Sequence, residues 1–346
     1  MPFLGDMSLT ESIALFCACT VIIVLAGTQL TKIVDELADR TGLGEALAGA
    51  VLLGMATSLP GIVLSVTAGY NAQPELALSN ALGGIAVQTL FLTVADMCLR
   101  RVNLEHAAAS IGNLMQGTLL LCLLSLILVG AFSPNVTVWG VHPITPLLLA
   151  GYFYGMTVVR RGQADAMWFP ARTRETREDV PDEAFGGKSL PRLWISFAGL
   201  ALALGISGWL LQRAATVLSV ETGLAQAVIG VLLTSIVTSL PELVTTVSAV
   251  RRGALTLAVS GIIGGNAFDT LFAAASDIAY RDGSIYHAVP DRVLLWVALS
   301  VLMTGVLLLG LIRREKHGPG RIGFESIALI VLYFSGVAMV VADSTG

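Results

Sequence analysis

The chain has 346 residues, of which 55% are hydrophobic and only 13% are charged, and its mean hydropathy is +0.80. These values lie outside the range of soluble globular proteins and exclude that class. Many apolar runs approach the roughly 20 residues that an α-helix needs to cross a bilayer. The net charge of −4 says little about partners, because the positions of the charges matter more than their sum. The composition therefore predicts an all-α integral membrane protein with several crossings.

Apolar runs bounded by charged residues and by Pro or Gly clusters predict ten membrane helices. The first run lacks the basic segment that begins a cleaved signal peptide, so no part of the chain is set aside as a targeting sequence. The ten expected helices cover approximately 10–34, 42–70, 74–99, 107–132, 143–160, 191–214, 222–250, 254–280, 290–312 and 323–343.

A hydrophilic stretch at 161–190 separates a first half, 1–160, from a second half, 191–346. Its mixed charges and few apolar residues are typical of a flexible linker. The loops after helices 1, 3, 5, 7 and 9 hold seventeen of the 20 Lys and Arg residues, and the other loops hold three. By the positive-inside rule, the linker is predicted to be cytoplasmic and both termini to lie outside.

The second half repeats the first at a constant offset of 181 residues. Residues 41–96 align without gaps with residues 222–277, and about 23 of the 56 positions are identical. Five crossings separate equivalent helices, and five is odd, so the two five-helix repeats are predicted to cross the membrane in opposite directions. Inverted repeats are typical of secondary transporters, which expose a midplane binding site to each side in turn.

Each repeat has a helix with a proline and hydroxyl side chains at membrane depth, in "TSLPG" at 57–61 and "TSLPE" at 238–242. A proline in mid-helix frees the carbonyl four residues earlier, at a cost of about 3 kcal/mol unless another group satisfies it. The freed carbonyls would be those of Ala56 and Val237. Because a cation can bind such an oxygen, the two segments predict an ion site.

The same segments and the helices that follow them supply further oxygen ligands. Glu242 lies three and four residues after Ser239 and Thr238, so these side chains share one helical face. The "GGNAFD" segment presents Asn266 and Asp269. Oxygen ligands with little nitrogen or sulfur favour hard cations such as Ca²⁺ or Na⁺. The predicted ligands are Glu242, Asp269, Thr238, Ser239, Thr57, Ser58 and Gln88.

An ionised Glu242 at mid-depth is difficult to explain by packing. A carboxylate there costs at least about 2.5 to 3.5 kcal/mol on insertion scales, and no Lys, Arg or His is predicted at that depth. With Asp269 the site has at most two negative charges, enough for one Ca²⁺ or two Na⁺. Asp96 and Asp277, which are equivalent in the repeats, lie near predicted helix ends, where an interfacial role is favoured over ion binding.

At these residues the sequence resembles the cation/Ca²⁺ exchanger superfamily, and its sodium/calcium exchanger branch in particular. The alpha repeats of that family carry a TSLPE-type segment and then a GSNxxN- or GSNxxD-type segment, which match 238–242 and 264–269 here. The first repeat is diverged, because Gly61 stands where the family has an acid and "GGIAVQ" at 83–88 replaces the second segment. The resemblance implies ten helices in two inverted repeats, with ion ligands at the matching positions.

The predicted function is a secondary-active antiporter that exchanges Na⁺ for Ca²⁺ by alternating access, not an enzyme. No cofactor is expected beyond the transported ions. The expected partners are the lipid bilayer and inorganic cations, without nucleic acid or an obligate protein partner, and the expected location is the plasma (inner) membrane.

Three alternatives stay open at this point. Proton coupling would need only one of the two acids, although all four histidines lie in predicted loops. A passive cation channel would show flux without a counter-ion. An intramembrane serine protease is suggested by "GISG" at 205–208, but its Ser207 would need a base and no predicted span contains a histidine, so a small-residue packing face is favoured.

Overall fold

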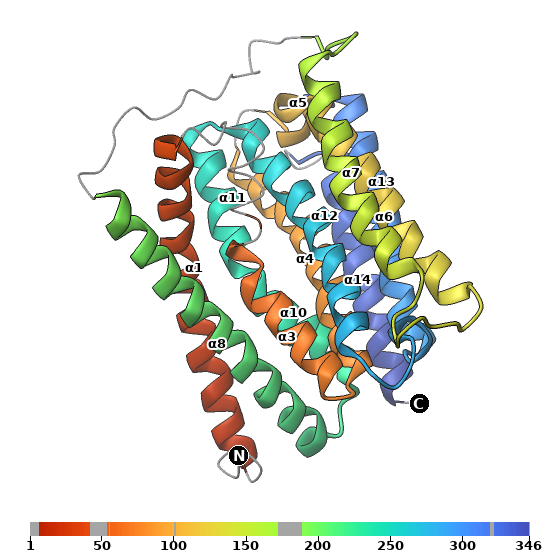
Figure 1. The fold of residues 1–346 in the computed structure, drawn as a ribbon. Helices are drawn as coiled ribbons and strands as arrows, with labels where there is room; N and C mark the ends of the chain where they lie inside the picture. Colours follow the sequence, from red (N-terminus) through yellow and green to blue (C-terminus); the bar gives the residue numbers. More distant parts are fainter. Residues whose placement is uncertain are drawn as a thin grey trace.

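The computed structural model describes residues 7–41, 54, 56–99, 102–171, 189–318 and 322–345. Among these residues the regular structure is helical, apart from one bridge between Val138 and Val141. The helices form one bundle (Figure 1). They are α1 (Leu9–Thr41), α3 (Leu59–Tyr70), α4 (Pro74–Cys98), α5 (Leu104–Ala108), α6 (Ile111–Phe132), α7 (Ile144–Ala164), α8 (Leu190–Thr222), α9 (Gln226–Val228), η2 (Ile229–Thr234), α10 (Ser235–Thr238), α11 (Leu240–Arg252), α12 (Leu255–Ala279), η3 (Ile285–His287), α13 (Asp291–Arg313) and α14 (Phe324–Thr345).

Length and composition identify the membrane helices. In the described part of the chain, seven helices are long and apolar enough to cross a bilayer: α1, α4, α6, α8, α12, α13 and α14. The segments 226–238 and 240–252 form an eighth candidate that is bent by 46°. This confirms an all-helical membrane protein. The expected helix at 42–70 lies partly outside the described residues and α7 is not among the seven, so the count of ten crossings stays a prediction.

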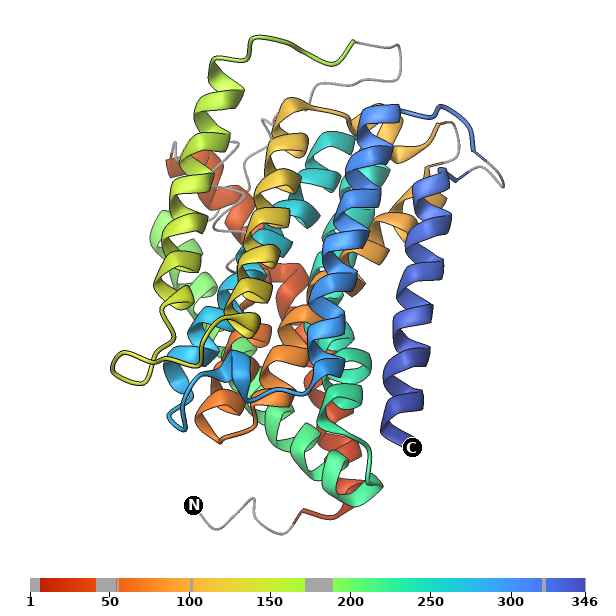
Figure 2. The same cartoon turned by 90° about the vertical axis from the view of Figure 1, so that its right-hand side faces the viewer.

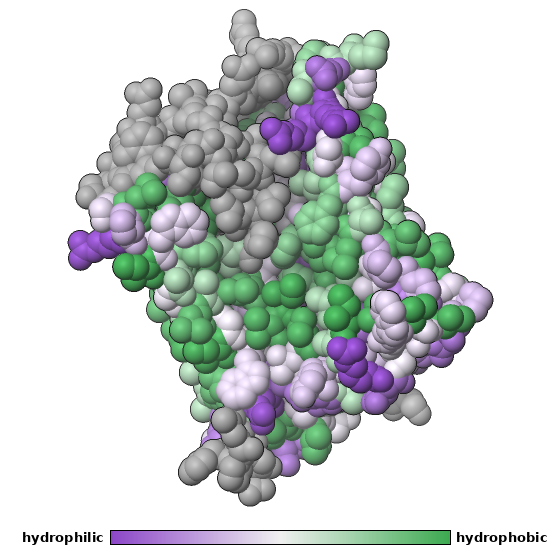
Figure 3. Space-filling model, viewed as in Figure 1, coloured by the Kyte–Doolittle hydropathy of each residue, from purple (hydrophilic) through white to green (hydrophobic). Residues whose placement is uncertain are grey.

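The surface agrees with a position in a bilayer. Apolar side chains dominate the middle of the face shown in Figure 3, and hydrophilic side chains gather toward its two ends. The start of α1 and the end of α14 lie at the same end of the bundle (Figures 1 and 2), as an even number of crossings requires. The expected linker at 161–190 begins inside α7, which continues to Ala164, and residues 172–188 lie outside the described part.

The two repeats run in opposite directions. Helix α3 runs from the middle of the bundle to the end where the C-terminus lies, and the equivalent helix α11 runs from the middle to the opposite end (Figure 1). Proline stands in the first turn of both helices, where a missing N–H costs little. Helix α11 ends at Gly253 with a φ of 88°, a left-handed conformation that glycine adopts without strain.

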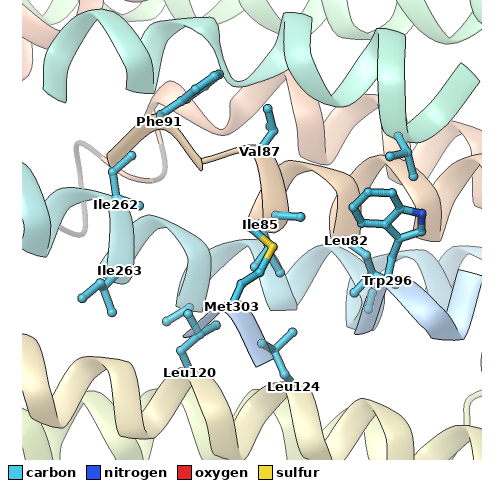
Figure 4. Close-up of a cluster of buried hydrophobic side chains, with 14 of the residues drawn as sticks. Leu82, Ile85, Val87, Phe91, Leu120, Leu124, Ile262, Ile263, Trp296 and Met303 are labelled. Carbon is cyan, nitrogen blue, oxygen red and sulfur yellow. The ribbon is translucent and has the colours of Figure 1, made fainter. Parts of the chain in front are cut away.

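Helices α4 and α12 form the centre of the bundle. Of their apolar spans, 78% and 72% are buried, against 28% for α1. In Figure 4, Leu82 and Ile85 of α4 lie with Leu120 of α6 and with Trp296 and Met303 of α13 in one apolar cluster. This packing surrounds the polar residues of α4 and α12 with a medium of low dielectric constant, which strengthens every electrostatic interaction there.

Two glycines let α1 and α8 approach the broken helices. Gly27 and Gly208 are equivalent at the offset of 181 residues. A Cβ atom on Gly27 would lie 2.6 Å from Cγ of Pro241, and one on Gly208 would overlap the carbonyl oxygen of Pro60. The Ser207 hydroxyl donates to the Ala203 carbonyl of its own helix. The "GISG" segment is therefore a packing face of small residues.

We expect Gly208→Ala to destabilise the protein by about 1–3 kcal/mol, because the added methyl group has no room against the Pro60 backbone. Gly199→Ala on the same helix is the matched control, since no atom lies within 4 Å of its Cβ position. Thermal unfolding of both variants in detergent checks the prediction. Equal melting temperatures would contradict the close packing of α8 on Pro60.

Candidate ion-binding site

The helix break in the second repeat presents Glu242 to the centre of the bundle. The chain bends by 46° between α10 and α11, and Glu242 lies in the first turn of α11. The N-terminal end of a helix favours a negative charge. Backbone N–H groups at the break donate to the Ser235, Ile236 and Val237 carbonyls. The Val237 carbonyl therefore already accepts a backbone N–H, cation binding at this oxygen stays a prediction, and the break places Glu242 at the start of a helix.

Hydroxyl and amide groups from both repeats join the two acids into one network. The Ser58 hydroxyl donates to Asp269 Oδ1 at 2.7 Å and lies 3.4 Å from Glu242 Oε1. Gln88 Nε2 donates to Asp269 Oδ2 at 2.6 Å and to Ser239 Oγ at 3.2 Å. The Ser58–Asp269 and Ser239–Gln88 contacts are equivalent at the offset of 181 residues, so the repeats meet at this network.

The two predicted threonines lie at its edge. The Thr57 hydroxyl donates to the Gly54 carbonyl at 3.2 Å, and its side chain lies close enough to Glu242 to interact with it. The Thr238 hydroxyl donates to the Ser235 carbonyl at 3.3 Å and faces Gly61, whose Cβ position is 3.6 Å away. The structure thus gathers all seven predicted residues in one region of the bundle, with Thr238 outside the hydrogen-bonded network itself.

The site is buried, and no basic side chain of the described residues balances its carboxyl groups. Glu242 is 5% exposed and Asp269 is 2% exposed. In the described ranges, no Lys, Arg or His side chain acts on either carboxyl. The hydrogen-bond donors that reach them are neutral hydroxyl and amide groups, so both acids lie in the interior without a counter-charge.

Three oxygens of the site have no donor from the described residues. They are Glu242 Oε2, Gln88 Oε1 and Asn266 Oδ1. The Asn266 amide is held by its nitrogen, which donates to Thr89 Oγ1 at 2.9 Å, and this leaves the amide oxygen as its unpartnered atom. Buried oxygens almost always have a partner in folded proteins. Oxygens that lack one beside two carboxyls are suited to ligate a hard cation.

Comparison with known proteins decides the family. The sequence profile of the sodium/calcium exchanger protein family matches residues 11–160 and 192–342. The chain belongs to the sodium/calcium exchanger family. Inner membrane protein YrbG of Escherichia coli (strain K12) is 25% identical to this chain over 309 residues, which cover 89% of this chain and 90% of YrbG. The putative antiporter CaxA of Alkalimonas amylolytica is 26% identical over 304 residues, which cover 87% and 91% of the two chains.

Solved structures show the same fold. A crystal structure of the H⁺/Ca²⁺ exchanger CAX superposes with a TM-score of 0.68 at 11% identity and covers 96% of this chain and 86% of that one. A structure of the sodium-calcium exchanger NCX_Mj soaked with Na⁺ superposes with a TM-score of 0.59 at 18% identity and covers 96% and 99%.

The chain differs from the family pattern at Gly61, and Phe272 packs against this position. A Cβ atom on Gly61 would lie 2.9 Å from Cε2 of Phe272, so the phenyl ring fills the space that an acidic side chain would need. Gly84 is different, because its Cβ position is 3.6 Å from Ser239 Oγ and 3.8 Å from Asp269 Oδ2, which is ordinary contact. The first repeat has thus exchanged an acid for packing at 61 but keeps space beside the site at 84.

The sequence reasoning missed Tyr152 and Phe272 as neighbours of the site. Tyr152 of α7 lies close enough to Asp269 for an electrostatic interaction. Its equivalent at the offset of 181 residues is Tyr333, and both tyrosines are followed by phenylalanine. This repeated "YF" pair would have extended the alignment to the fifth helix of each half.

Asp96 and Asp277 hold loop segments near the ends of their helices, and their interfacial role stays a prediction. Each buried carboxyl lies near the end of its helix and binds two backbone N–H groups and one hydroxyl, and the partners are equivalent at the same offset. Asp96 accepts from Leu104 N (2.7 Å), Gly323 N (3.2 Å) and Ser326 Oγ (3.0 Å), and Asp277 accepts from Ile285 N (3.0 Å), His142 N (2.9 Å) and Thr145 Oγ1 (2.6 Å).

Proposed function

We propose that this protein is a secondary-active antiporter that exchanges Na⁺ for Ca²⁺ across the membrane by alternating access. The observation that carries the proposal is the pair of buried carboxyls, Glu242 and Asp269, with no basic side chain among the described residues to balance them. Buried anions need a counter-charge in a medium of low dielectric constant. A cation that passes through the site supplies that charge.

The atoms around the carboxyls favour Ca²⁺ and Na⁺ over softer metals, because they are carboxylate, hydroxyl and amide oxygens. No group of three or more His, Cys, Asp or Glu residues forms a metal site in the ranges that the structure describes. Two charges and several neutral oxygens suit an ion that must leave again. The proposed ligands are Glu242, Asp269, Thr238, Ser239, Thr57, Ser58 and Gln88.

The charge of the site limits the coupling. Two carboxylates neutralise one Ca²⁺ or two Na⁺, whereas a third Na⁺ would leave the buried site with a net positive charge. Gly61 and Gln88 stand at two positions where the family pattern has acidic or amide ligands. We therefore propose that fewer Na⁺ ions are coupled to each Ca²⁺ than in relatives with a third acid.

Proton coupling is the second candidate, and the same two carboxyls favour it, because either acid can take up a proton in place of a cation. One relative of known structure is described as an H⁺/Ca²⁺ exchanger. The histidines are not placed to assist, since His106, His142 and His287 hydrogen-bond near the ends of the bundle. His106 lies in the short helix α5 rather than in a loop as predicted.

Uptake of ⁴⁵Ca²⁺ into proteoliposomes separates these candidates. A Na⁺ gradient and a proton gradient are imposed in separate experiments, with the Glu242→Gln variant as the inactive control. Uptake driven by the Na⁺ gradient alone is expected. Uptake driven by the proton gradient alone would select the second candidate, and uptake that needs no counter-ion would indicate a channel.

The orientation is a separate proposal. A cysteine introduced at Gly187 is expected to resist an impermeant thiol reagent added to intact cells, and one at Gly346 is expected to react, because the Lys and Arg residues place the linker in the cytoplasm. The experiment needs a background without native cysteines, since Cys17, Cys98 and Cys122 are exposed on the protein. The reverse labelling pattern would overturn the orientation.

A further inference from the structure

Equivalent residues make equivalent contacts at the two ends of the bundle. Besides Asp96 and Asp277, His106 and His287 are equivalent, and their rings bind equivalent carbonyls. His106 Nδ1 lies 2.7 Å from the Arg314 carbonyl oxygen, and His287 Nε2 lies 2.8 Å from that of Ser133. A difference between the ends is therefore meaningful, because the surrounding contacts are the same.

The ends differ in their carboxyl groups. Near Asp277, position 286 is a tyrosine whose hydroxyl lies 2.9 Å from Thr145 Oγ1. Near Asp96, the equivalent residue is Glu105. A second acid, Glu325, replaces the apolar residue Ile144 of the other end. We refer to Asp96, Glu105 and Glu325 as the carboxyl cluster.

The carboxyl cluster is enclosed and short of donors. The exposed fractions of its three residues are 0%, 1% and 1%. No N–H or O–H group in the described part of the chain donates to either oxygen of Glu105 or to Oε2 of Glu325. The Glu105 and Glu325 carboxyl groups lie close enough to interact with each other. A hydrogen bond between two carboxyl groups requires a proton on one of them.

No basic side chain described near Glu105 is placed to neutralise the carboxyl groups around it. The carboxyl groups of Asp96 from α4 and Glu325 from α14 interact electrostatically with Glu105. The guanidinium of Arg314, after α13, donates to the carbonyls of His106 and Ala171, and Arg313 pairs with Glu315 at 3.4 Å. Helix α12 brings no charged side chain to this end, since its sequence is uncharged up to Asp269.

Burial and the neighbouring Asp96 and Glu325 carboxyls raise the pKa of Glu105 well above its usual value. A metal ion is a poor alternative occupant, because no group of three acids or histidines among the described residues has metal-site geometry.

We propose that the carboxyl cluster is a proton-binding site distinct from the midplane ion site, in which Glu105 carries the proton and donates it to Glu325. Loss of that proton places a second negative charge within hydrogen-bond reach of Glu325 and beside Asp96. Asp96 joins α4 to Leu104 at the start of α5 and to Ser326 in α14. Deprotonation therefore weakens the contacts that Asp96 makes between α4, α5 and α14.

The sign of the pH dependence follows from this assignment. A carboxyl with a raised pKa in the folded protein contributes stability that is fully present at acidic pH. That contribution is lost as the pH rises through the pKa of Glu105. The contacts that Asp96 makes between these helices are consequently strongest at acidic pH and weaken as the pH rises.

Infrared difference spectroscopy and hydrogen exchange of the purified full chain test the proposal. We expect the carbonyl band of protonated carboxyl groups to contain a component that disappears as the pH rises in the wild type and in Glu242→Gln but is absent from Glu105→Gln. Exchange of the Leu104 amide, relative to an unstructured peptide, should accelerate over the same pH range in the wild type only. Glu221→Gln, at an exposed position on α8, is the matched control and should keep both responses.

A second variant tests the same proposal in case Glu105→Gln does not fold. Glu105→Tyr combined with Glu325→Ile gives this end the residues of the other end, and it should also lose the Glu105 component of the band and the pH-dependent exchange. A titrating band of the same size in the wild type and in both variants, or an exchange ratio of Leu104 that does not change with pH in the wild type, would overturn the proposal.

Discussion

Replacement of Glu242 by Gln is expected to abolish divalent-cation transport while leaving the fold intact. The amide has nearly the same volume as the carboxylate but no charge, and the other charged group at the site, Asp269, cannot balance a Ca²⁺ ion alone. Removing one member of a buried ion pair costs about 3–5 kcal/mol, and about 1.4 kcal/mol is a factor of ten, so Ca²⁺ affinity should fall at least about 100-fold.

Two measurements check this prediction. Ca²⁺ should raise the melting temperature of the wild type, because a ligand that binds only the folded state stabilises it, and this rise should disappear in Glu242→Gln. Without Ca²⁺ the variant should be at least as stable as the wild type, since it no longer buries an unbalanced charge. Glu221→Gln should behave like the wild type in both assays. Transport of Ca²⁺ by Glu242→Gln at the wild-type rate would show that the midplane site is not the transport site.

The repeat predicted more of this site than its motifs did. A constant offset places Ser58 opposite Ser239 and Gln88 opposite Asp269, and the structure joins these four residues in two equivalent contacts. The offset also holds outside the aligned segments, at Gly27 and Gly208. Sequence periodicity detects such equivalence because both repeats must solve the same packing problem around the same site.

The sequence could not show how side chains from distant segments fill space. The prolines were predicted in mid-helix, but they begin new helices after a break, so their missing N–H groups cost little. The contact of the Phe272 ring with Gly61 and the pairing of Glu105 with Glu325 join residues that are far apart in the chain. These features depend on the packed structure, and only local patterns are visible in a single sequence.

The pair of Gly61→Glu and Phe272→Ala tests whether the first repeat has lost an ion ligand. Gly61→Glu alone is expected to destabilise the protein by about 1–3 kcal/mol, because its Cβ would lie 2.9 Å from the Phe272 ring. Adding Phe272→Ala removes that ring and gives the new carboxylate room beside Thr238. The stability lost by the double variant should therefore be smaller than the sum of the losses of the two single variants, and Phe272→Ala alone is measured as the control.

The third carboxylate is expected to change the coupling of the double variant. Three buried carboxylates cannot all stay ionised without more bound cations, so the site should bind an additional Na⁺ or hold a proton on one of the acids. An additional Na⁺ would raise the Hill coefficient for Na⁺ and make exchange more sensitive to voltage, since one Ca²⁺ against two Na⁺ moves no net charge. A retained proton would instead give a new pH dependence of transport. Proteoliposomes with a clamped membrane potential distinguish these results from the control, and a folded, active double variant with neither change would mean that position 61 does not face the ion site.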